Sequence, residues 1–588
     1  MKEKWLVRNK KEEFLKLSKD VDENSLILRL LANRGISTKE AASLFLNGKT
    51  FDMYDSFLLK DLKEGVNIIK NAIEKGKKIV IYGDYDCDGV CSTTILYKGL
   101  KRLGANFKYH IPNRENEGYG MNKDRINILR EEGFEVLLTC DNGISAFEEV
   151  TFAKELGFEV VITDHHDIPI IEENGEKVRS FPEGDAVVNP KREDCKYPFK
   201  NLCGAGVAFK FVQGLYKEFS IPIEESFELL EYAAIATVCD VVDIVDENRI
   251  IVKKGLELIN NTKNKGLKEL IKVKKLEEKE ISEYHFGFVI GPCINATGRL
   301  EIADISVELL ITEDDDRAKE LASKLNDLNE KRQELTSEST EKVIEKIESS
   351  LSKDDKVIVV YEGSIHESIA GIVAGRVREK YNLPSIVMTS GKEMPKGSGR
   401  SIEEYNMFLE LSKCKSILSK FGGHPMAAGL SVLEENIPLL RKELNDKCTL
   451  TEEDVIPKVI IDAPLQIEYL NMELVNKLSN MRPFGKGNWS PIFAVKDVTV
   501  KRVIFMGKDK NFLRFKMEYG NGKQIDGVNF NKFEKFKEMY IDKYGEEGFL
   551  KLQDSGYCNF KMDILYYPEI NEFKGISNIQ LSIKSFRL

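Results

Sequence analysis

Apolar segments of about five or six residues alternate with helix-like segments through the first third of the chain. The apolar segments are rich in β-branched residues and are followed by polar or acidic ones, as strands that lead into loops are. Strands separated by helices imply right-handed crossovers and a mostly parallel sheet. The predicted strands are KIVIYG (78–83), FKYHI (107–111), EVLLTC (135–140), EVVITD (159–164) and DAVVN (185–189), and the predicted helices lie near 89–103, 123–132 and 145–156 and over most of 204–239.

The pattern changes after residue 313. Residues 314–350 contain no proline or glycine, and their apolar positions recur at roughly helical spacing, which predicts one long connecting helix. A coiled-coil oligomer is the alternative, but the apolar seam is too short and broken. A second α/β unit is expected next, with strands at 356–361 and 384–389. From about residue 455, short strands separated by glycine and charged turns suggest a small β-barrel.

Composition describes an ordinary soluble protein, with 42% hydrophobic and 31% charged residues, and its 588 residues imply three or four domains. No segment approaches the ~20 apolar residues of a membrane span. The charged N-terminus lacks the apolar middle of a signal peptide. Ten cysteines without a C-x-x-C pair suit a reducing compartment better than a disulfide framework. We therefore expect a cytoplasmic protein that does not contact a membrane.

The net charge of −10 argues against a protein coated in positive charge, but a local basic region remains. Residues 481–540 contain 13 Lys and Arg against 6 Asp and Glu, interleaved with aromatic residues. Such interleaving fits a surface that binds single-stranded nucleic acid, although for most of these rings a place in the core of a β-domain is the stronger expectation. Among these rings are Phe484, Trp489, Phe493, Phe505, Phe512, Phe515 and Tyr519.

Acidic residues and histidines follow three of the predicted strands. The strings are G-D-Y-D-C-D-G (83–89), C-D-N-G around Asp141, and T-D-H-H (163–166). Because parallel strands end at the same edge of a sheet, these groups should converge there. Crowded carboxylates and imidazoles repel and desolvate one another unless a cation lies among them. The pattern therefore predicts a metal site.

Oxygen ligands with one or two imidazoles suit Mn²⁺ or Mg²⁺. A loop that bends at Gly83 and Gly89 would turn several of the first motif's aspartates inward. Asp240, at the end of an apolar helix, is a reasonable further ligand because a buried carboxylate needs a partner. So many acidic groups exceed the needs of one ion, whereas two ions roughly 3.5–4 Å apart would use them and suit attack on phosphorus.

Simpler explanations exist for each motif alone. D-x-D-x-D-G resembles half of a calcium loop, but no Glu follows at the EF-hand position. Asp141 could merely cap a helix, and His165 and His166 could be a satisfied surface pair. The chain has only six histidines, and two of them are consecutive after an acidic residue at a strand end. Together the motifs favour the metal site.

This set of motifs resembles the DHH phosphoesterase family, and within it the bacterial single-strand-specific 5′→3′ DNA exonucleases. The resemblance runs in order from about 65 to 495 and is weak outside that range. Matching strings beyond the three motifs are IPNRENEGYG (111–120), GPCINATGRL (291–300), HESIAGIVAGR (366–376), GSGRS (397–401), FGGHPMAAG (421–429) and PFGKGNWSP (483–491). Two residues depart from the family's motifs. Ser368 stands where the family commonly has glycine, and Cys87 stands at a position of the first motif that the family fills with a small residue.

The resemblance implies an α/β fold with a parallel-sheet DHH catalytic domain, a long connecting helix, a smaller DHH-associated α/β domain and a C-terminal OB-like β-barrel. The expected boundaries are 1–67 for an N-terminal helical extension, 68–313 for the catalytic domain, 314–350 for the connecting helix, 351–450 for the associated domain and 451–588 for the OB-like domain. The active cleft is expected between the two α/β domains, and the OB-like domain is expected to guide a nucleic-acid strand.

Carried over by position, the resemblance also implies roles for individual residues. The expected metal ligands for two divalent cations are Asp84, Asp86, Asp88, Asp141, His165, His166 and Asp240, of which Asp86, Asp141, His165 and His166 are the expected catalytic residues. Asp164 is expected to hold a histidine in orientation. Substrate-binding residues are expected at Arg114, Asn295, Arg299, His366, Ser398, Arg400, Gly422, Gly423 and His424. Of these, Arg114, Ser398 and Arg400 are expected to grip a terminal 5′-phosphate, and Asn295 and Arg299 are expected to line the same cleft. His366 and His424 are expected on the face of the associated domain toward the metals.

The implied activity is a metal-dependent exonuclease that releases 5′-mononucleotides from single-stranded DNA in recombination and repair. Expected partners are single-stranded DNA, a single-strand-binding protein and a RecQ-type helicase, with the chain itself a monomer. One alternative is a phosphodiesterase of the same family that acts on short oligoribonucleotides, cyclic dinucleotides or pyrophosphate, but those proteins generally lack the terminal barrel. A metal-free replication scaffold is the other alternative, and such relatives lose motif carboxylates that this chain retains.

Overall fold

The structure, a computed structural model, describes residues 3–114, 116–118, 120–173, 176–350, 352, 355–507, 511–573 and 575–588. Glu115 and Tyr119 of the string at 111–120 lie outside the described residues. The chain divides into two compact units. The first unit comprises Tyr54–Val242 and Lys254–Pro457, and the second unit comprises Lys4–Met53, Asp243–Lys253 and Lys458–Leu588.

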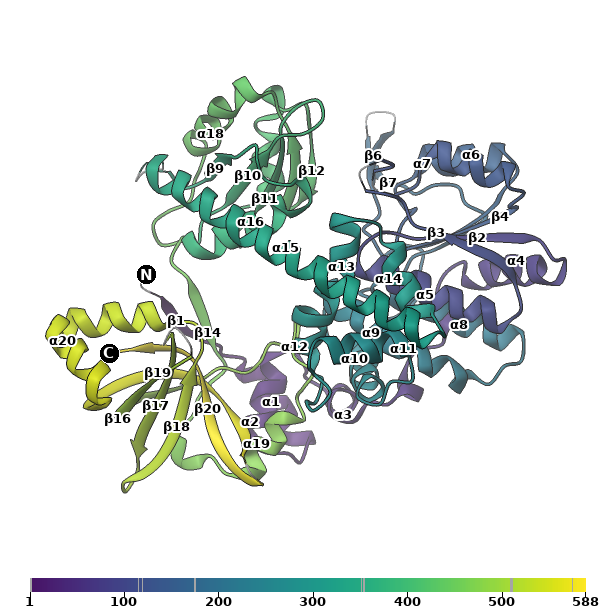
Figure 1. Cartoon of the computed structure of the whole chain (residues 1–588). Coiled ribbons are helices and arrows are strands. Elements are labelled where there is room, and N and C mark those ends of the chain that lie inside the picture. Colours follow the sequence, from purple (N-terminus) through teal and green to yellow (C-terminus); the bar gives the residue numbers. More distant parts are fainter. Residues whose placement is uncertain are drawn as a thin grey trace. The chain divides into compact units, whose positions relative to one another are not determined.

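A five-stranded parallel sheet organises the beginning of the first unit (Figure 1). In spatial order its strands are β3 (Asn106–His110), β2 (Lys78–Tyr82), β4 (Val136–Cys140), β5 (Glu159–Thr163) and β8 (Ala186–Val188). The last four residues of β2 and all of β4 and β8 are buried, as expected when helices cover both faces of a sheet. The predicted parallel sheet is therefore confirmed.

The helices around this sheet follow the alternation predicted from the sequence. α5 follows β2, packs against α8 and α9, and runs between the sheet and the helices that come later in the chain. The helical elements of the first unit up to residue 311 are η2 (Ser56–Leu58), α4 (Leu62–Glu74), α5 (Cys87–Arg102), α6 (Lys123–Glu131), α7 (Phe147–Glu155), α8 (Gly204–Glu218), η3 (Ile223–Leu229), α9 (Leu230–Cys239), α11 (Lys265–Val273), α12 (Glu283–His285), η4 (Phe286–Ile290), α13 (Gly291–Leu300) and α14 (Asp304–Ile311). Helix α10 (Asp246–Ile259) begins in the second unit and ends in the first. A small hairpin, β6 (Ile170–Glu173) and β7 (Glu176–Arg179), precedes β8.

The direction of chain travel changes beside β2. From β2 the chain passes to β3 on one side, then returns to β4 on the other. Loops that follow β2 and β4 therefore leave a crevice at the carboxyl ends of these strands, where α/β sheets bind ligands. All three acidic motifs follow strands at this edge.

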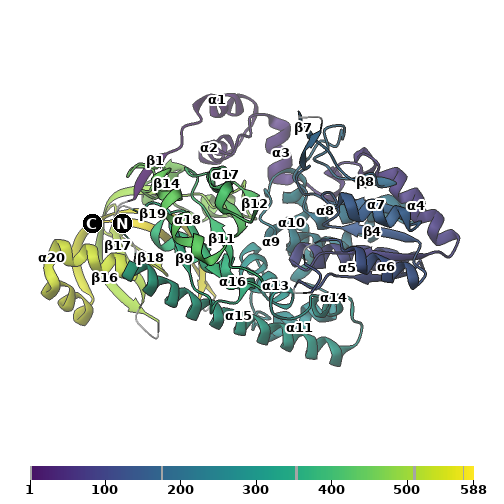
Figure 2. The ribbon, with the colours of Figure 1, turned by 90° about the horizontal axis from the view of Figure 1, so that it is seen from above.

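One helix of 36 residues, α15 (Asp315–Ser350), follows this region, as the absence of proline and glycine predicted. It packs against α11, α13 and α14 along its first part and against α16 and β9 along its second (Figure 2). The second α/β region has the strand order β12, β13, β11, β10, β9. Its elements are β9 (Ile358–Tyr361), α16 (Glu367–Tyr381), β10 (Ser385–Thr389), β11 (Lys396–Arg400), α17 (Met407–Ser412), η5 (Lys415–Ile417), β12 (Lys420–His424), β13 (Ala427–Ser431), η6 (Glu434–Asn436) and α18 (Ile437–Asp446).

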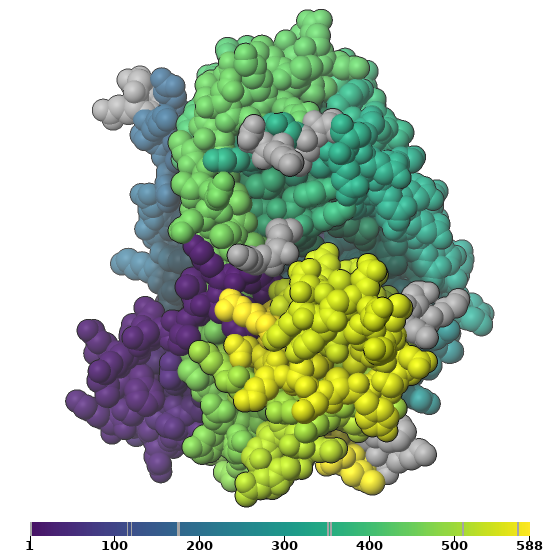
Figure 3. All heavy atoms as spheres, turned by 90° about the vertical axis from the view of Figure 1, so that its left-hand side faces the viewer, coloured from purple at the N-terminus to yellow at the C-terminus, as the bar shows by residue number. Residues whose placement is uncertain are grey.

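The second unit combines the two ends of the chain. β1 (Lys4–Val7) pairs in parallel with β14 (Lys458–Ile461) (Figure 1), so the expectation that the first residues form only helices and loops is wrong. In the space-filling view, residues from the N-terminal part of the chain (purple) lie beside green and yellow residues from its C-terminal part (Figure 3). The sequence pattern hid this strand because it has no buried residue. The other N-terminal elements are α1 (Lys11–Asp20), α2 (Ser25–Asn33), α3 (Lys39–Asn47) and η1 (Thr50–Asp52).

Five long strands form the body of the second unit. Their pairings run β16–β17–β18–β20–β19, and β19 also pairs with β16, so each of the five has two hydrogen-bonded neighbours among them; β16 pairs with β15 as well. The expectation of short strands is wrong, since β16 has 14 residues and β19 has 17. The elements are β15 (Ala463–Pro464), η7 (Ile467–Tyr469), α19 (Met472–Ser479), β16 (Phe493–Met506), β17 (Phe512–Tyr519), β18 (Lys523–Asn529), α20 (Phe533–Ser555), β19 (Tyr557–Phe573) and β20 (Ile576–Arg587).

Most aromatic residues of the basic segment 481–540 are core residues. Phe493 and Phe515 are fully buried, Phe484 is nearly so, and Phe505 and Tyr519 pack against the same apolar cluster. The side chain of Trp489, in contrast, is 62% exposed. The core interpretation of this segment therefore holds for most rings.

Arg249 ties together the three chain segments of the second unit. Its guanidinium donates hydrogen bonds to the carbonyl oxygens of Phe45 (2.7 Å), Asn480 (3.0 Å) and Met481 (3.0 Å), and it stacks 3.9 Å from the centre of the Phe45 ring. The residue is 2% exposed. Only a side chain with several fixed donors satisfies carbonyls from two directions.

Within the described residues, no helix is long and apolar enough to cross a membrane.

Replacing Arg249 by Ala or Lys is expected to destabilise the second unit by at least about 3 kcal/mol, because several buried carbonyl groups lose a charged donor. Both tryptophans of the chain, Trp5 and Trp489, lie in this unit, so tryptophan fluorescence during urea unfolding reports on it. The exposed Lys496→Ala substitution in the same unit is the control. Equal unfolding midpoints for Arg249→Lys and this control would contradict the role given to Arg249.

Candidate metal centre

The first acidic motif forms the turn between β2 and α5. Asp86 caps α5: its Oδ1 accepts the backbone N–H of Asp88 (2.8 Å) and of Gly89 (3.0 Å). A Cβ on Gly83 would lie 2.1 Å from Thr93 Oγ1, which explains the first glycine of the motif. Gly89 lies in the first turn of α5, so the expected second bend at this residue is wrong. Asp84 and Asp88 are both 2% exposed.

Asp88 is held by a part of the chain that the sequence did not indicate. Its two carboxylate oxygens accept the backbone N–H groups of Gly204 and Ala205, each at 2.7 Å. These amides form the start of α8, where a carboxylate is favoured by the positive end of the helix dipole. A Cβ on Gly204 would lie 2.6 Å from Asp141 Oδ1, so glycine is required there. The string G-A-G at 204–206 is the only feature of the local sequence that indicates this contact with Asp88.

The second motif, C-D-N-G, follows β4. Asn142 donates hydrogen bonds to the carbonyl oxygens of Tyr82 and Cys140, both at 3.1 Å, and thereby joins the ends of β2 and β4. Asp141 adopts a left-handed backbone conformation (φ 61°), which Asp tolerates better than most residues, and it is 2% exposed. Its carboxylate is therefore placed at the sheet edge by a rigid turn.

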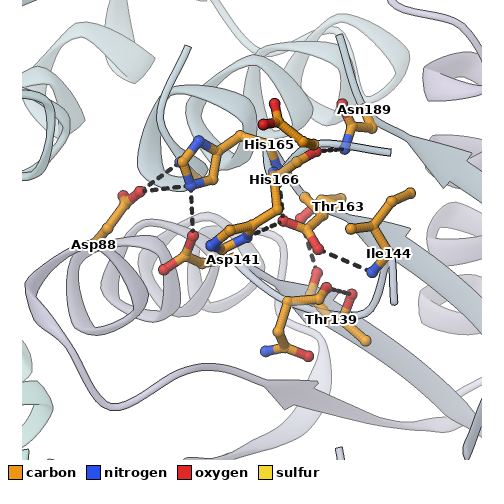
Figure 4. Close-up of polar contacts among 12 residues, drawn as sticks. Asp88, Thr139, Asp141, Ile144, Thr163, His165, His166 and Asn189 are labelled. Carbon is orange, nitrogen blue, oxygen red and sulfur yellow. Dashed lines mark hydrogen bonds and ion pairs between the residues drawn. The ribbon is translucent and has the colours of Figure 1, made fainter. Parts of the chain in front are cut away.

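The third motif, D-H-H, follows β5 (Figure 4). Asp164 accepts the backbone N–H groups of His165 (2.7 Å), His166 (3.1 Å) and Ile144 (2.9 Å), and it contacts Nδ1 of His166 at 2.8 Å. Burial alone would raise the pKa of Asp164, but the hydrogen bond from His166 and the backbone donors lower it to about 2. Burial alone would lower the pKa of His166, but the bond to Asp164 raises it to about 9. Asp164 thus orients the ring of His166.

One nitrogen atom, Nε2 of His165, lies beside carboxylates from three separate elements. Its distances are 3.1 Å to Asp141 Oδ1, 3.5 Å to Asp88 Oδ2 and 3.7 Å to Asp240 Oδ2. Asp240 caps the C-terminus of the apolar helix α9, as expected from its sequence. The structure therefore brings the three strand-end motifs and Asp240 together (Figure 4 shows Asp88, Asp141 and His165).

Burial and mutual repulsion keep protons on these carboxylates in the absence of a cation. Burial, followed by the charges of neighbouring aspartates, raises the pKa of Asp84 and of Asp240 to about 8 and that of Asp141 well above its usual range. Burial also raises the pKa of Asp88. Protonation is the alternative to a cation for such a cluster.

The donor atoms fit more than one divalent cation. Three sets have ligand atoms within 4.8 Å of one another: Asp141 with His165 and His166; Asp88 with His165 and Asp240; Asp84 with Asp86 and Asp141. Asp141 belongs to two of these sets, as a carboxylate that bridges two ions would. Buried Asp84 Oδ1 and His165 Nδ1 have no hydrogen-bond partner within the described part of the chain. Oxygen and imidazole donors of this kind suit Mn²⁺ and Mg²⁺.

The predicted phosphate-binding residues form two groups. Arg114, Ser398 and Gly422 line one cavity of about 350 Å³, together with Lys396 and Lys420. The guanidinium of Arg114 lies 5.3 Å from the ring centre of Tyr85, inside the first acidic motif. Glu367 also lines the cavity and pairs with Lys396 at 2.7 Å, which leaves Arg114 and Lys420 as the cations without that partner. A cavity with an excess of cationic side chains and two glycine-lined strands suits a phosphate group.

The other predicted residues lie outside the lining of this cavity. Asn295 Oδ1 accepts the backbone N–H of Cys87 at 2.9 Å, at the start of α5. Arg400 lies against Gly371, where a Cβ would come within 2.7 Å of its Nη2. Gly423 and His424 are exposed on β12. The structure thus does not bring the whole expected set into one pocket.

Ser368, one of the two departures from the family pattern, has a local role. Its hydroxyl lies 2.7 Å from Nδ1 of His366, and its carbonyl accepts a hydrogen bond from Arg299 at 2.6 Å. His366 caps α16 through the backbone N–H of Ser368. His366 and Arg299 therefore meet at the first turn of α16.

Comparison with known proteins agrees with this geometry. The DHH family N-terminal domain matches residues 78–237, the DHHA1 domain matches 354–449, and the RecJ OB domain matches 461–585. The single-stranded-DNA-specific exonuclease RecJ of Bacillus subtilis is 38% identical over 99% of this chain and 70% of its own length. The RecJ of Salmonella typhimurium is 30% identical over 99% of this chain and 98% of its own length.

A solved structure from the same group of proteins is similar to this chain over its whole length. RecJ from Thermus thermophilus, in complex with Mn²⁺, superimposes with a TM-score of 0.80 and 25% identity, covering 100% of this chain and 79% of that one. The full-length relatives, the three domain matches and this superposition agree with the order of the domains. The chain belongs to the RecJ family, whose catalytic domain is of the DHH type.

Proposed function

We propose that this chain is a metal-dependent exonuclease that degrades single-stranded DNA from its 5′ end and releases 5′-mononucleotides. The observation that carries the proposal is the buried cluster in which Asp141 and His165 each belong to two sets of metal-donor atoms. Relatives similar to this chain over nearly its whole length are single-stranded-DNA-specific exonucleases, and one RecJ structure contains Mn²⁺. A pair of Mn²⁺ or Mg²⁺ ions is therefore the proposed cofactor.

The side chains of the cluster have separable tasks. When bound, a pair of divalent cations stabilises both the attacking and the leaving oxygen of an in-line displacement at phosphorus. The side chains that would hold the cations are Asp84, Asp86, Asp88, Asp141, His165, His166 and Asp240. Asp164 keeps the imidazole of His166 in one orientation. Backbone amides hold the carboxylates of Asp86, Asp88 and Asp164, so these three groups need little rearrangement when cations bind.

The direction of degradation would follow from the cavity around Ser398. Arg114, Lys396 and Lys420 line this cavity, and Glu367 in the same lining pairs with Lys396 at 2.7 Å, so the cavity has a net charge of about two positive units. A terminal 5′-phosphate carries more charge than an internal phosphodiester, so this cavity would select the 5′ end. The metal-free scaffold is disfavoured because the cluster retains every expected carboxylate. The phosphodiesterase of short substrates is disfavoured because residues 461–585 match the RecJ OB domain.

Binding of single-stranded DNA belongs to this proposal. Contacts with a single-strand-binding protein and a RecQ-type helicase, a monomeric state and a cytoplasmic location stay predictions.

Asp141→Asn is expected to lower the rate of single-stranded DNA degradation by more than about 100-fold, since loss of a group that merely orients a ligand already costs about 10–100-fold. For Asp164→Asn, the rate should fall by about 10–100-fold and recover in part as the Mn²⁺ concentration is raised. This substitution weakens the orientation of His166 but keeps every metal ligand. Release of nucleotides from labelled single-stranded DNA is the measurement. Full activity of the Asp141→Asn, His165→Ala double variant would contradict the assigned site.

The metal-free protein is expected to lose stability as the pH rises from about 4 to about 8. In that range Asp84 and Asp240 remain protonated in the folded chain, with a pKa of about 8, but ionise in the unfolded chain. The folded state then binds more protons, so rising pH favours unfolding. Mn²⁺ at a concentration 100 times its dissociation constant should raise the free energy of unfolding by about 2.7 kcal/mol.

Thermal unfolding with EDTA and with Mn²⁺ at pH 5.5 and pH 8 tests this expectation. The stabilisation by Mn²⁺ should be larger at pH 8, since cations and protons compete for the same oxygens. It should be small in Asp141→Asn and unchanged in the exposed control Glu225→Gln. Equal stabilisation of Asp141→Asn and wild type would place the bound metal elsewhere.

Arg114→Ala is expected to reduce the preference for a 5′-phosphate over a 5′-hydroxyl on otherwise identical single strands by about 10-fold or more, the size of a lost charge-assisted contact. Arg102→Ala, which removes an exposed arginine paired with Glu225, is the control. An unchanged ratio of kcat/KM for the two substrates in Arg114→Ala would show that the cavity around Ser398 does not read the 5′ end.

A further inference from the structure

The loop between β3 and α6 carries Arg114, which lines the cavity around Ser398 (Figure 1). This loop folds back on itself, because the backbone N–H of Glu117 donates to the carbonyl oxygen of Asn113 at 2.8 Å. The side-chain oxygen of Asn113 closes the same turn by accepting the backbone N–H of Asn116 at 3.1 Å. Arg114 therefore directly follows the first residue of a closed turn.

The side chain of Glu117 connects this turn to a helix. Its Oε2 accepts the backbone N–H of Asn113 at 2.9 Å, and its Oε1 lies 2.8 Å from Nε and 2.7 Å from Nη2 of Arg125. Arg125 belongs to the first turn of α6. Contact with two nitrogens of a planar guanidinium restricts the orientation of a carboxylate. Glu117 thus ties the residue before Arg114 to the start of α6.

The same carboxylate lies beside the end of β3. Nε2 of His110, the last residue of β3, is 3.3 Å from Oε2 of Glu117, and the His110 ring packs edge-to-face against Tyr82 of β2 with the ring centres 5.0 Å apart. The carbonyl oxygen of His110 accepts the backbone N–H of Gly83, where the first acidic motif begins, at 2.9 Å. The turn that holds Arg114 and the turn between β2 and α5 therefore share a support at the end of β3.

The charge of Glu117 is balanced by Arg125. Burial alone would raise the pKa of Glu117, but the backbone N–H of Asn113 and the guanidinium of Arg125 lower it, so the carboxylate is ionised at neutral pH. Burial lowers the pKa of His110 to about 4, so its ring is neutral at the same pH. The side chain of Glu117 is only 14% exposed. Removal of Arg125 would leave this carboxylate with little water to replace its partner.

We propose that Glu117, held by Arg125, is a positioning residue that fixes Arg114 for its contact with the 5′-terminal phosphate. This inference rests on the proposed function, in which Arg114 makes that contact. A guanidinium on a closed turn loses less conformational freedom on binding than one on an open loop. Glu117 is absent from the lining of the cavity around Ser398 and from the three metal-donor sets, so it would act through Arg114.

The ion pair also answers an electrostatic objection. An isolated carboxylate three residues from Arg114 would repel an incoming phosphate and offset part of the attraction of the arginine. Because Arg125 neutralises Glu117, the turn gains rigidity without this penalty. Removal of either charge should therefore weaken recognition of the 5′-phosphate.

The test measures kcat/KM of Glu117→Gln and Arg125→Gln with Mn²⁺ on two single strands of one sequence, which carry either a 5′-phosphate or a 5′-hydroxyl. Each substitution should lower kcat/KM for the phosphorylated strand by about 3-fold or more, the effect of one hydrogen bond, chiefly through a higher KM. The value for the hydroxylated strand should not change. A merely structural role would lower both values together.

A double-mutant cycle shows whether Glu117 acts through Arg114. In an Arg114→Ala background, Glu117→Gln should cause no further loss, because the group that it positions is gone. Arg125→Lys keeps the charge and should lie between the unsubstituted chain and Arg125→Gln. The control is Glu148→Gln, which removes a carboxylate that is 2.7 Å from Lys123 of the same helix and 79% exposed. It should leave both kcat/KM values unchanged.

Thermal unfolding with and without Mn²⁺ verifies that each variant folds and binds metal, and Arg125→Lys supplies the test if Glu117→Gln does not fold. An unchanged preference for the 5′-phosphate, an equal loss on both strands, or a further loss of preference in the Arg114→Ala background would overturn the proposal. Failure of the proposed function is a different result. It would appear as no Mn²⁺-dependent degradation by the unsubstituted chain, or as no effect of Arg114→Ala alone.

Discussion

The mutual repulsion of buried carboxylates around His165 is the constraint on which the rest of the structure depends. Three aspartates from different elements lie within 3.7 Å of one imidazole nitrogen, in a region from which water is largely removed. Each carboxylate must hold a proton or share a cation. No apolar contact stabilises such an arrangement, so the cluster is understandable only as a site for positive charge.

Backbone amides make this cluster rigid. Asp86 is bound by the first turn of α5, Asp88 by the first turn of α8, and Asp164 by the amides of the loop that it begins. Helix termini supply unpaired N–H groups and a positive dipole end, so they hold carboxylates without adding a competing cation. The parallel sheet and the helices that cover it therefore serve to bring these termini to one edge.

The sequence allowed the parallel sheet and the convergence of the three motifs to be predicted, because strand and motif are adjacent in the chain. It did not reveal Gly204 and Ala205 as partners of Asp88, since 116 residues separate Gly204 from Asp88 and no periodic pattern marks the contact. Pairing of β1 with β14 escaped notice for the same reason. The role of Arg249 could not be predicted either, because an arginine in an amphipathic helix is normally expected to face solvent.

The second unit shows a different limit of structure prediction from the sequence. Its strands were expected to be short because charged and glycine residues interrupt the apolar pattern, yet β16 and β19 continue through charged positions. α20 was missed, and Gly545, with φ 76°, interrupts its helical backbone. The resemblance gave a set of expected substrate-binding positions. Only the three-dimensional structure distinguishes the residues that line a cavity, such as Arg114 and Ser398, from those that do not.

The most direct test of the account is the position of Mn²⁺ in a crystal of this chain, located by anomalous scattering. The account predicts two ions that share Asp141, one beside Asp84 and Asp86 and the other beside His165. Binding of Mn²⁺ away from Asp141 and His165, or no ordered Mn²⁺ at concentrations that support nuclease activity, would contradict it.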